Sequence, residues 1–359
     1  MKVAILGAGN VGVAIAADLS IKGHEVSLIK TSNTKSEVFD TIKANGNRVF
    51  LKENQQYTQA VIADVTHDIE AASDAEVVFV TVQSTYHKEV IKKLSYYLNS
   101  KQIVVCICSY MSYFYFRRYC KSLPVIVETI GPYLEGRVEM EDMPGEVVFR
   151  VGCRLTRSPL SISRKDSDDY MYTLKSLDPS FSDEYNLLEA ALLNPNMVLH
   201  TVGAIMSIPR IEYSHGNFCM YREAYSHENP ATLNIMNELD REKRQVLYAL
   251  GCKPVDIYDA GGFLGNKMES FFRYSESSDR AISPTSVKSR YITEDVSQGL
   301  VLLESIAHTA HMTVPVTSAL IDIASAALLY DFRECGRTIH GLGAEEYIHE
   351  LIAKQYGCA

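Results

Sequence analysis

The stretch KVAILGAGNVG, residues 2–12, decides the fold of the first half of the chain. Its five leading residues form a short apolar run, which is typical of a buried parallel strand. The next six residues form G-x-G-x-x-G, and an alanine-rich helical pattern follows over residues 13–20, with Gly23 as its end. A glycine motif between a strand and a helix is the context in which G-x-G-x-x-G indicates dinucleotide binding rather than an ordinary turn.

The three glycines of the motif, with Asn10 and Val11, are the first predicted cofactor contacts. Gly7 permits the tight turn, Gly9 has no side chain to hold a pyrophosphate away from the backbone, and Gly12 lets the helix pack closely on the strand. Asn10 and Val11 lie with Gly12 at the helix N-terminus, whose N–H groups and partial positive charge favour phosphate.

The end of the second predicted strand, residues 24–29, is where such folds bind the adenosine ribose. A carboxylate at this position accepts a hydrogen bond from the ribose 2′-hydroxyl of NAD(H), but this strand ends without one. The residues that follow could together hold a 2′-phosphate; they are Lys30, Thr31, Ser32 and Lys35. The pattern favours NADP(H) over NAD(H), and the alternative is that both lysines are solvated surface residues.

Strand and helix patterns alternate as far as residue 129. Strand patterns cover 48–52, 57–64, 76–82, 102–108 and 124–129, and helical patterns cover 36–45, 68–73 and 87–98. This alternation predicts an α/β fold with a doubly wound parallel sheet of the Rossmann type. Because ligands bind beyond the carboxyl ends of parallel strands, Val82, Gln83 and Ser84 are further predicted cofactor contacts.

The pattern then changes twice. Residues 137–141 and 146–155 alternate on either side of Met143-Pro144-Gly145, which predicts an antiparallel hairpin attached to the sheet, with one more strand at 158–163. Later patterns are helical, over 187–193, 198–206, 230–250, 293–310 and 315–329. We therefore expect a Rossmann domain at 1–184 and an all-α substrate and catalytic domain at 185–359.

Composition argues against several classes of protein. The 359 residues carry a net charge of −9, which disfavours nucleic-acid binding, and the sequence has no run of 18 apolar residues to form a membrane span. The first strand begins without a signal-peptide pattern, so the eight scattered cysteines indicate reduced thiols and the predicted location is the cytoplasm. His308 and His311 have no third ligand nearby, so we expect no metal site.

Three polar residues of the helical half are the candidates for catalysis. His200 lies early in an apolar helix after the turn Asn194-Pro195, and Arg290 precedes another helix whose first turn contains Glu294 and Asp295. By pattern alone, His200 could be a core histidine, the two carboxylates could complement the helix dipole, and Arg290 could form a surface ion pair.

The motifs around these residues resemble those of the opine dehydrogenase family, of the octopine/nopaline and N-(1-carboxyethyl)-norvaline dehydrogenase type. NPNMVLHT, residues 194–201, is similar to its N-x-x-L-H-T segment, and SRYITEDVSQGLVLLESIA, residues 289–307, is similar to its R-Y-x-x-E-D-V-x-x-G-L-V-P-L-x-E segment. DFRECGRT at 331–338, followed by GLG, and VETIG at 127–131 resemble two further blocks. With GAGNVG, the similarity spans nearly the whole chain.

The resemblance implies an NAD(P)-dependent enzyme that condenses an amino acid with a 2-oxo acid and reduces the imine by hydride transfer. It implies that His200 is the catalytic acid/base, that Asp295 pairs with it, and that Arg290 binds the oxo-acid carboxylate. The residue types suit these roles, because an imidazolium can protonate the departing oxygen and a guanidinium matches a carboxylate. The implied partners are small-molecule substrates, and the family suggests a homodimer.

Two segments bear on substrate specificity. SYMSYFYF, residues 109–116, is far more aromatic than the segment of small residues that the family has near the cofactor, and burial in a helix core is the favoured explanation. Residues 213–225 are predicted to contribute Tyr221 to the amino-acid pocket.

Two alternative functions remain. One is a ketopantoate-reductase-like, NADP-dependent reductase of 2-oxo or 3-hydroxy acids that needs no amine, and the other is a nucleotide sensor without catalysis.

Overall fold

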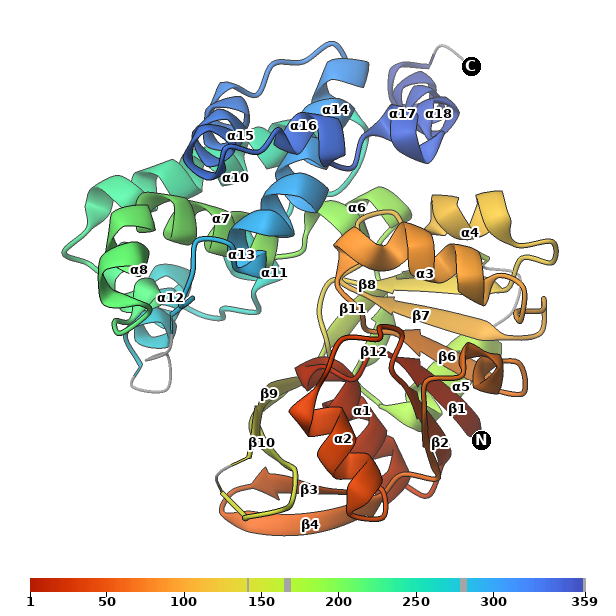
Figure 1. The fold of residues 1–359 in the computed structure, drawn as a ribbon. Helices are drawn as coiled ribbons and strands as arrows, with labels where there is room; N and C mark the ends of the chain where they lie inside the picture. Colours follow the sequence, from red (N-terminus) through yellow and green to blue (C-terminus); the bar gives the residue numbers. More distant parts are fainter. Residues whose placement is uncertain (141, 165–168, 278–282, 358–359) are drawn as a thin grey trace. The chain divides into compact units, whose positions relative to one another are not determined.

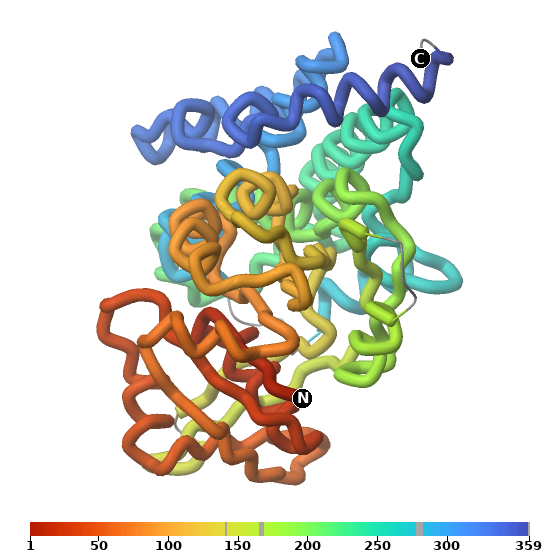
Figure 2. The backbone as a smooth tube through the Cα atoms, turned by 90° about the vertical axis from the view of Figure 1, so that its right-hand side faces the viewer, coloured from red at the N-terminus to blue at the C-terminus, as the bar shows by residue number. Residues whose placement is uncertain are grey.

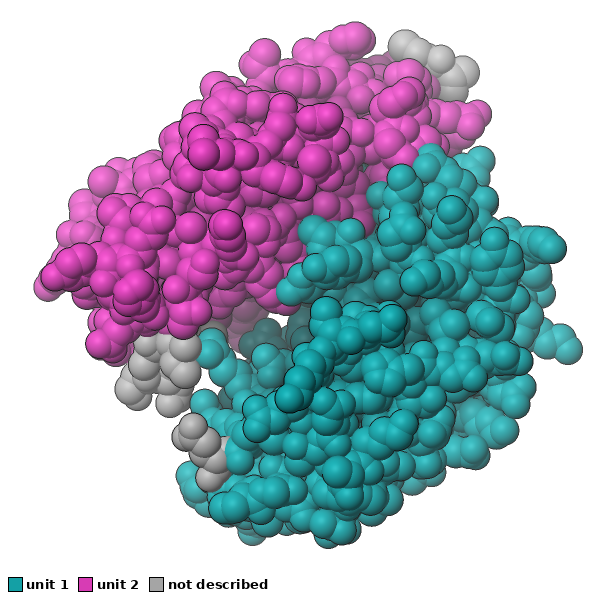
Figure 3. Space-filling view, viewed as in Figure 1, with its two compact units in different colours: residues 1–190 teal, residues 191–359 magenta. Residues whose placement is uncertain are grey.

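The computed structural model describes residues 1–140, 142–164, 169–277 and 283–357 (Figure 1; the backbone is turned by 90° in Figure 2). The chain divides into two compact units, Met1–Ala190 and Ala191–Ala359, which Figure 3 colours teal and magenta. The division falls inside helix α6 (Leu187–Leu192), a few residues beyond the boundary that we expected from the sequence.

Unit 1 is built on an eight-stranded sheet with the order β12-β11-β8-β7-β6-β1-β2-β5. Its strands are β1 (Lys2–Leu6), β2 (Glu25–Ile29), β5 (Asp64–Thr66), β6 (Val77–Val80), β7 (Ile103–Ile107), β8 (Val125–Thr129), β11 (Ser158–Ile162) and β12 (Phe181–Asp183). Only the β8–β11 pair is antiparallel among these neighbours. The strands β6, β7 and β8 are buried along their whole length, as expected of a sheet covered on both faces, so the doubly wound sheet is confirmed.

The carboxyl ends of the central strands meet at one edge of this sheet. Leu6 at the end of β1 pairs with Ile29 of β2 and with Val80 of β6, so the three strands end together. The helices of the unit are α1 (Asn10–Ile21), α2 (Glu37–Ala44), α3 (His87–Leu94), α4 (Tyr113–Tyr119) and α5 (Asp169–Leu177), with 3-10 turns at Ile69–Ala72 and Ser84–Tyr86. The glycine motif, the loop after β2 and the loop after β6 therefore lie at a common edge.

A second sheet in unit 1, β4-β3-β10-β9, corrects two predictions. Its strands are β3 (Arg48–Glu53), β4 (Gln56–Val61), β9 (Leu134–Glu139) and β10 (Val148–Arg154). The predicted hairpin is the antiparallel pair β9–β10, but it joins β3 instead of the parallel sheet. The single strand expected at 57–64 is two strands, β4 in this sheet and β5 in the other. Glu141, which ends the first predicted hairpin strand, lies outside the described residues.

Helix α1 explains how one unit holds two sheets. Residues 12–19 are all buried, and α1 packs against β1 and β2 of the first sheet and against β3, β4 and β9 of the second. Ala14, Ala16 and Ala17 are completely buried, and such small side chains let strands approach the helix closely from several sides. A helix that is apolar all round is typical of a core position.

Unit 2 is helical throughout the part that the structure describes. Its helices are α7 (Asn196–Met206), α8 (Ile208–Ser214), α9 (Met220–Ala224), α10 (Pro230–Ala249), α11 (Ile257–Ala260), α12 (Lys267–Glu276), α13 (Arg290–Thr293), α14 (Val301–Thr309), α15 (Pro315–Leu328), α16 (Phe332–Cys335), α17 (Ile339–Leu342) and α18 (Glu345–Tyr356). Helix α7 is central, because α9, α10, α13 and α15 all pack on it. The predicted all-α second part is confirmed.

The helix that we predicted at 293–310 has a break in its geometry. A π-helical turn, η4 (Asp295–Leu300), separates α13 from α14, so the backbone is wider for six residues than in an α-helix.

Within the described residues, no single helix is long and apolar enough to cross a membrane. Two sharply bent helix pairs meet that test only when the length and composition of both helices are combined.

Candidate active site

The glycine turn between β1 and α1 has the geometry of a phosphate cradle. Gly7 has a φ of +119°, and a Cβ there would lie 2.6 Å from Oγ1 of Thr81. A Cβ at Gly12 would lie 1.7 Å from the carbonyl oxygen of Gly7, so no side chain fits at either position. A Cβ at Gly9 would meet nothing within 4 Å. The protein thus leaves space beside Gly9, where the motif would place the pyrophosphate.

The start of α1 fits an anionic ligand in its charge as well. Gly9 is the N-cap residue and supplies no side-chain cap, and the first turn contains no carboxylate. The first N–H groups of an α-helix have no acceptor inside the helix, so they can donate to phosphate. Oδ1 of Asn10 accepts a hydrogen bond from the Val138 N–H at 3.0 Å, which ties the turn to β9.

The loop after β2 is wrapped around a buried ammonium group. Lys30 is 6% exposed, and its Nζ donates to the carbonyl oxygen of Ser32 at 2.6 Å, to the Ser32 hydroxyl at 3.0 Å and to the carbonyl oxygen of Thr34. These three bonds use all three donors of the ammonium. Lys30 therefore holds its own loop together, a contact that we did not predict, while Lys35 is exposed and Thr31 is partly exposed.

The residues after β6 are anchored to the glycine turn and to α3. The Thr81 hydroxyl donates to the carbonyl oxygens of Leu6 and Gly7, at 3.0 and 3.2 Å. The Val82 carbonyl oxygen lies 3.0 Å from Nε2 of His87, and Ser84 is buried at the start of a 3-10 turn whose N-cap is Gln83. The geometry places this segment at the carboxyl edge of the sheet, as expected for a loop beside a bound dinucleotide.

Sequence reasoning missed the residue that organises the loop after β7. Cys108, Tyr110 and Met111 all have positive φ angles of 50–64°, a conformation that non-glycine residues rarely adopt. The buried carboxylate of Glu128 accepts from the backbone N–H groups of Met111 and Tyr113, at 3.0 and 2.7 Å, and from the Ser109 hydroxyl. The only signal in the sequence was one acidic residue in the apolar strand VIVET.

The aromatic residues that follow this loop are mostly core residues. Phe114, Tyr115 and Phe116 lie in α4 and are at most 8% exposed, as are Tyr110 and Met111 in the loop before them. Their burial agrees with the explanation favoured from the sequence, that the aromatic residues of this segment belong to a helix core. The segment gives no support to an aromatic substrate pocket.

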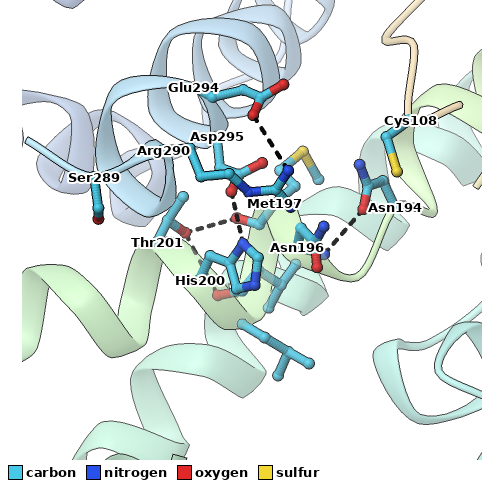
Figure 4. Close-up of polar contacts among 12 residues, drawn as sticks. Cys108, Asn194, Asn196, Met197, His200, Thr201, Ser289, Arg290, Glu294 and Asp295 are labelled. Carbon is cyan, nitrogen blue, oxygen red and sulfur yellow. Dashed lines mark hydrogen bonds and ion pairs between the residues drawn. The ribbon is translucent and has the colours of Figure 1, made fainter. Parts of the chain in front are cut away.

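In unit 2, His200 and Asp295 form a buried pair. Nδ1 of His200 lies 2.8 Å from Oδ2 of Asp295, and the two residues are 5% and 3% exposed (Figure 4). His200 comes from the middle of α7, and Asp295 is the first residue of the π-helical turn. With Nδ1 in contact with a carboxylate, Nε2 is the ring nitrogen that could exchange a proton with a substrate, an arrangement suited to general acid/base catalysis.

The segment DFRECGRT, residues 331–338, shapes the turn that carries Asp295. The Ser297 carbonyl oxygen in this π-helical turn accepts the N–H of Arg337 at 2.8 Å. A Cβ at Gly336 would lie 2.8 Å from that same oxygen and 2.4 Å from the Phe332 carbonyl oxygen. Glycine is therefore required for the close approach of two backbones, and a contact from outside the helix occupies a carbonyl of the widened turn.

Arg290 lies on the same helical segment as Asp295. Its side chain is 44% exposed, and Nη1 lies 3.9 Å from Oε2 of Glu294, whose side chain is nearly buried. Figure 4 shows Arg290, Glu294 and Asp295 on one ribbon, with Asp295 directed toward His200 on α7. A partly exposed guanidinium beside an acid/base pair could bind the carboxylate of a small substrate in two parallel hydrogen bonds.

Two tyrosines border the His200 ring. The Tyr291 ring stacks on it, with centroids 3.7 Å apart and an angle of 5° between the planes. The Tyr221 ring meets it by an edge, with centroids 6.5 Å apart and an angle of 77°. The structure thus brings the predicted Tyr221 to the predicted histidine and adds Tyr291, which the sequence analysis did not single out.

Comparisons with known proteins match both parts of the chain. The family model for the NAD/NADP octopine/nopaline dehydrogenase α-helical domain matches residues 184–328, and the model for the NAD-dependent glycerol-3-phosphate dehydrogenase N-terminus matches residues 2–111. Vitopine synthase from Allorhizobium ampelinum is 27% identical, and the match covers 96% of this chain and 97% of that protein. Opine dehydrogenase from Arthrobacter sp. strain 1C is 24% identical, over 95% and 94% of the two chains.

Solved structures share the fold. An octopine dehydrogenase structure described as containing NADH and pyruvate superimposes with a TM-score of 0.73 at 18% identity, covering 96% of each chain. A ketopantoate reductase of the PanE/ApbA family from Ralstonia eutropha superimposes with a TM-score of 0.60 at 18% identity, covering 99% of this chain and 100% of that chain. At these identities the likeness concerns the fold alone.

Proposed function

Because this chain belongs to the opine dehydrogenase family, we propose that it joins an amino acid to a 2-oxo acid and reduces the product with NAD(P)H. The enzyme is an NAD(P)-dependent oxidoreductase that acts on the C–N bond of opines. The observation that carries the proposal is the buried pair of His200 and Asp295, one helical turn from Arg290. The substrates of this class are small molecules with at least two carboxylates between them.

The carbonyl oxygen of the oxo acid must leave as water before its carbon can accept a hydride. The amino group attacks the oxo carbon, the carbonyl oxygen departs as water, and a C=N bond forms between the two substrates. Nε2 of a protonated His200 would donate the proton that the departing oxygen needs, and Asp295 would hold the ring in the tautomer that allows this. The same nitrogen, once neutral, can accept a proton from the incoming ammonium group of the amino acid.

Arg290 and Tyr221 would place the two substrates. Arg290, whose side chain is partly exposed, would bind the carboxylate of the oxo acid and so fix the position of the carbonyl carbon. Tyr221, on α9 and edge-on to His200, would border the amino acid, which approaches the same carbon. Each substrate would then depend on a different residue, and kinetics can separate the two roles.

The residues that would hold the cofactor lie along one edge of the parallel sheet. Gly7, Gly9 and Gly12, with the α1 N-terminus, would bind the pyrophosphate, and the segment from Val82 to Ser84 would lie beside it. When bound, the nicotinamide supplies the hydride that reduces the C=N carbon. The protein would orient the substrates and transfer the protons.

The loop after β2 supports NADP(H) as the preferred cofactor. Residues 30–35 contain two lysines and no carboxylate, and the buried ammonium of Lys30 adds positive charge beside the Ser32 hydroxyl group. Lys35 is exposed and within the same loop. A ribose 2′-phosphate would find opposite charge there, whereas the ribose of NAD(H) would lack the carboxylate that usually binds its hydroxyl groups.

Amine dependence tests the proposal. Oxidation of NADPH and of NADH is followed with pyruvate or oxaloacetate, with and without a mixture of L-amino acids. We expect turnover only when oxo acid and amino acid are both present, and its loss in H200A with cofactor affinity preserved. Turnover with the oxo acid alone would instead indicate a reductase of the ketopantoate-reductase kind, and cofactor binding without any turnover would indicate a nucleotide sensor.

A further inference from the structure

The stack of Tyr291 on His200 is unusual in its geometry. The centroids are 3.7 Å apart and the planes differ by only 5°, so the rings lie face to face and closer than the roughly 4.5–7 Å usual for aromatic pairs. Two neutral aromatic rings prefer an offset or an edge-to-face arrangement, because the negative faces of their π systems repel each other. A positively charged ring has the opposite preference, since it is attracted to the face of an electron-rich phenol. The observed geometry therefore suits a protonated His200.

Asp295 and Tyr291 constrain the imidazole in different ways. The hydrogen bond from Nδ1 to Oδ2 of Asp295 fixes one atom of the ring but allows the ring to pivot about that bond. A parallel aromatic face fixes the plane of the ring. Together the two contacts limit the direction of Nε2 more than either contact does alone.

One helical turn supplies both constraints. Tyr291 and Asp295 are four residues apart, so they lie on the same face of the segment formed by α13 and the π-helical turn. Arg290 precedes Tyr291 directly. A single segment packed on α7 thus carries the carboxylate partner of His200, the ring that covers it and the proposed clamp for the oxo acid.

We propose that Tyr291 is a positioning residue that holds the protonated His200 ring in the orientation needed to donate its proton. This inference rests on the proposed function, because it assigns the proton donor of the condensation. Tyr291 itself exchanges no proton in this account, and its aromatic face is the active feature rather than its hydroxyl group. A phenylalanine should therefore replace it, and an aliphatic side chain of similar size should not.

Other charges on the helices around α7 are engaged elsewhere. Arg290 and Glu294 lie beside Asp295, as described above. The contacts on α8, α9, α10 and α15 include Arg210 with Glu223, Arg222 with the Glu276 carbonyl oxygen, Arg241 with Glu238, Lys243 and Arg244 with Asp240, Glu242 with the N-terminus of α15, and Asp322 with Arg333. Asp295 is in hydrogen-bond contact with the ring, and the Tyr291 ring is stacked on it.

The test compares Y291F, Y291L and a matched control. Tyr258 is also a partly buried tyrosine of unit 2, packed edge-to-face on Phe271 and hydrogen-bonded to Asn237. Y258L therefore measures how much activity is lost when a tyrosine ring is removed elsewhere in the unit. In steady-state kinetics we expect Y291L to lower kcat about 3- to 30-fold, with little change in the KM for the oxo acid. The alkaline limb of its kcat–pH profile should move down by roughly half to one pH unit. Y291F should keep most of the activity.

A second measurement is independent of turnover. The His200 ring is titrated by NMR in the whole protein, with its signals assigned by their loss in H200A. The midpoint should fall in Y291L relative to Y291F and to Y258L. Equal midpoints and equal kcat in Y291L and Y258L would overturn the inference while leaving the proposed function intact. Loss of kcat in Y291F as large as in Y291L would overturn it too, since the hydroxyl group would then be the active feature. An inactive wild-type enzyme would contradict the proposed function, and the titration would still decide the role of Tyr291.

Discussion

Nδ1 of His200 lies 2.8 Å from Oδ2 of Asp295, although 95 residues separate them in the chain and both are nearly buried. Burying a carboxylate is costly unless it is paired, and a buried histidine beside it is stabilised in the charged form. In the proposed function this pair supplies the proton donor, and the fold of unit 2 sets the orientation of its ring.

Removing the charge of Asp295 should slow the reaction without releasing the cofactor. In D295N the ring loses the carboxylate that stabilises its protonated form and fixes its tautomer, so we expect kcat to fall about 10²- to 10³-fold. The Kd for NADPH, measured by fluorescence, should change little. The control is D322N, which removes an exposed carboxylate of the same unit and should keep wild-type kinetics. A kcat for D295N within threefold of the wild type would remove Asp295 from the proposed machinery.

Replacing Arg290 should weaken the binding of the oxo acid selectively. R290Q keeps a polar side chain but loses the charged, two-pronged donor, so the KM for the oxo acid should rise about 10- to 100-fold. The KM for the amino acid should change much less. Initial rates over a grid of both substrate concentrations give the two constants separately.

Replacing Tyr221 should weaken the binding of the amino acid selectively. Y221A should raise the KM for the amino acid more than the KM for the oxo acid, because the ring borders the amino-acid side of His200 in the proposed arrangement. Read together, R290Q and Y221A should show opposite selectivity. Parallel increases in both constants for both variants would mean that the two residues act through packing and not through separate substrates.

An acidic residue at position 31 should shift the cofactor preference. T31D places a carboxylate in the loop after β2, where it would repel a 2′-phosphate and accept from a ribose hydroxyl, so the kcat/KM ratio of NADPH to NADH should fall about tenfold or more. Thr31 is a better target than Lys30, whose buried ammonium holds the loop. A ratio unchanged from the wild type, in a variant with an unchanged melting temperature, would refute the assignment of this loop to the phosphate.

The buried carboxylate of Glu304 should make the stability of unit 2 depend on pH. Burial alone would raise its pKa, but hydrogen bonds from Arg333 at 2.6 and 2.8 Å and from Ser318 at 2.6 Å outweigh burial and hold the pKa below its ordinary value of 4.5. Its contribution is therefore present above pH 4.5 and is lost as the pH falls through the lowered value. E304Q should be less stable than the wild type by about 1–2 kcal/mol at pH 7.

Urea unfolding at pH 7 and at about pH 3.5 checks the sign of this effect. The difference between the wild type and E304Q should shrink at the lower pH, because the wild-type carboxylate is then increasingly protonated. A difference that stays constant or grows toward low pH would show that the carboxylate charge is not the stabilising feature.

Local patterns were enough to predict the central part of the fold. The strand, glycine turn and helix of residues 2–21 follow one another in sequence, and each apolar strand of the parallel sheet is bounded by its own helix or turn. The pairing of His200 with Asp295 rested on the family resemblance, since the separate helical patterns do not show that two helices meet. The hairpin β9–β10 was predicted, but its partner β3 was not, because the two are joined only by tertiary packing around α1.

The missed features share a physical cause. The π-helical turn at Asp295 involves a hydrogen bond from Arg337, forty residues after Ser297, and no local pattern indicates it. The Lys30 ammonium turns back onto its own loop, which a count of charges cannot reveal. The stack of Tyr291 on His200 likewise depends on two helices packing at a definite rotation, and a tyrosine next to a candidate arginine looks unremarkable in the sequence.

Isotope transfer tests the central claim most directly. The protein is incubated with pyruvate, a mixture of L-amino acids and nicotinamide cofactor carrying deuterium at the transferred position, and the products are analysed by mass spectrometry. We predict a secondary amine with one deuterium on the carbon that was the oxo carbon, formed in a one-to-one ratio with oxidised cofactor. Deuterated lactate, formed at the same rate whether or not amino acids are present, would contradict the account.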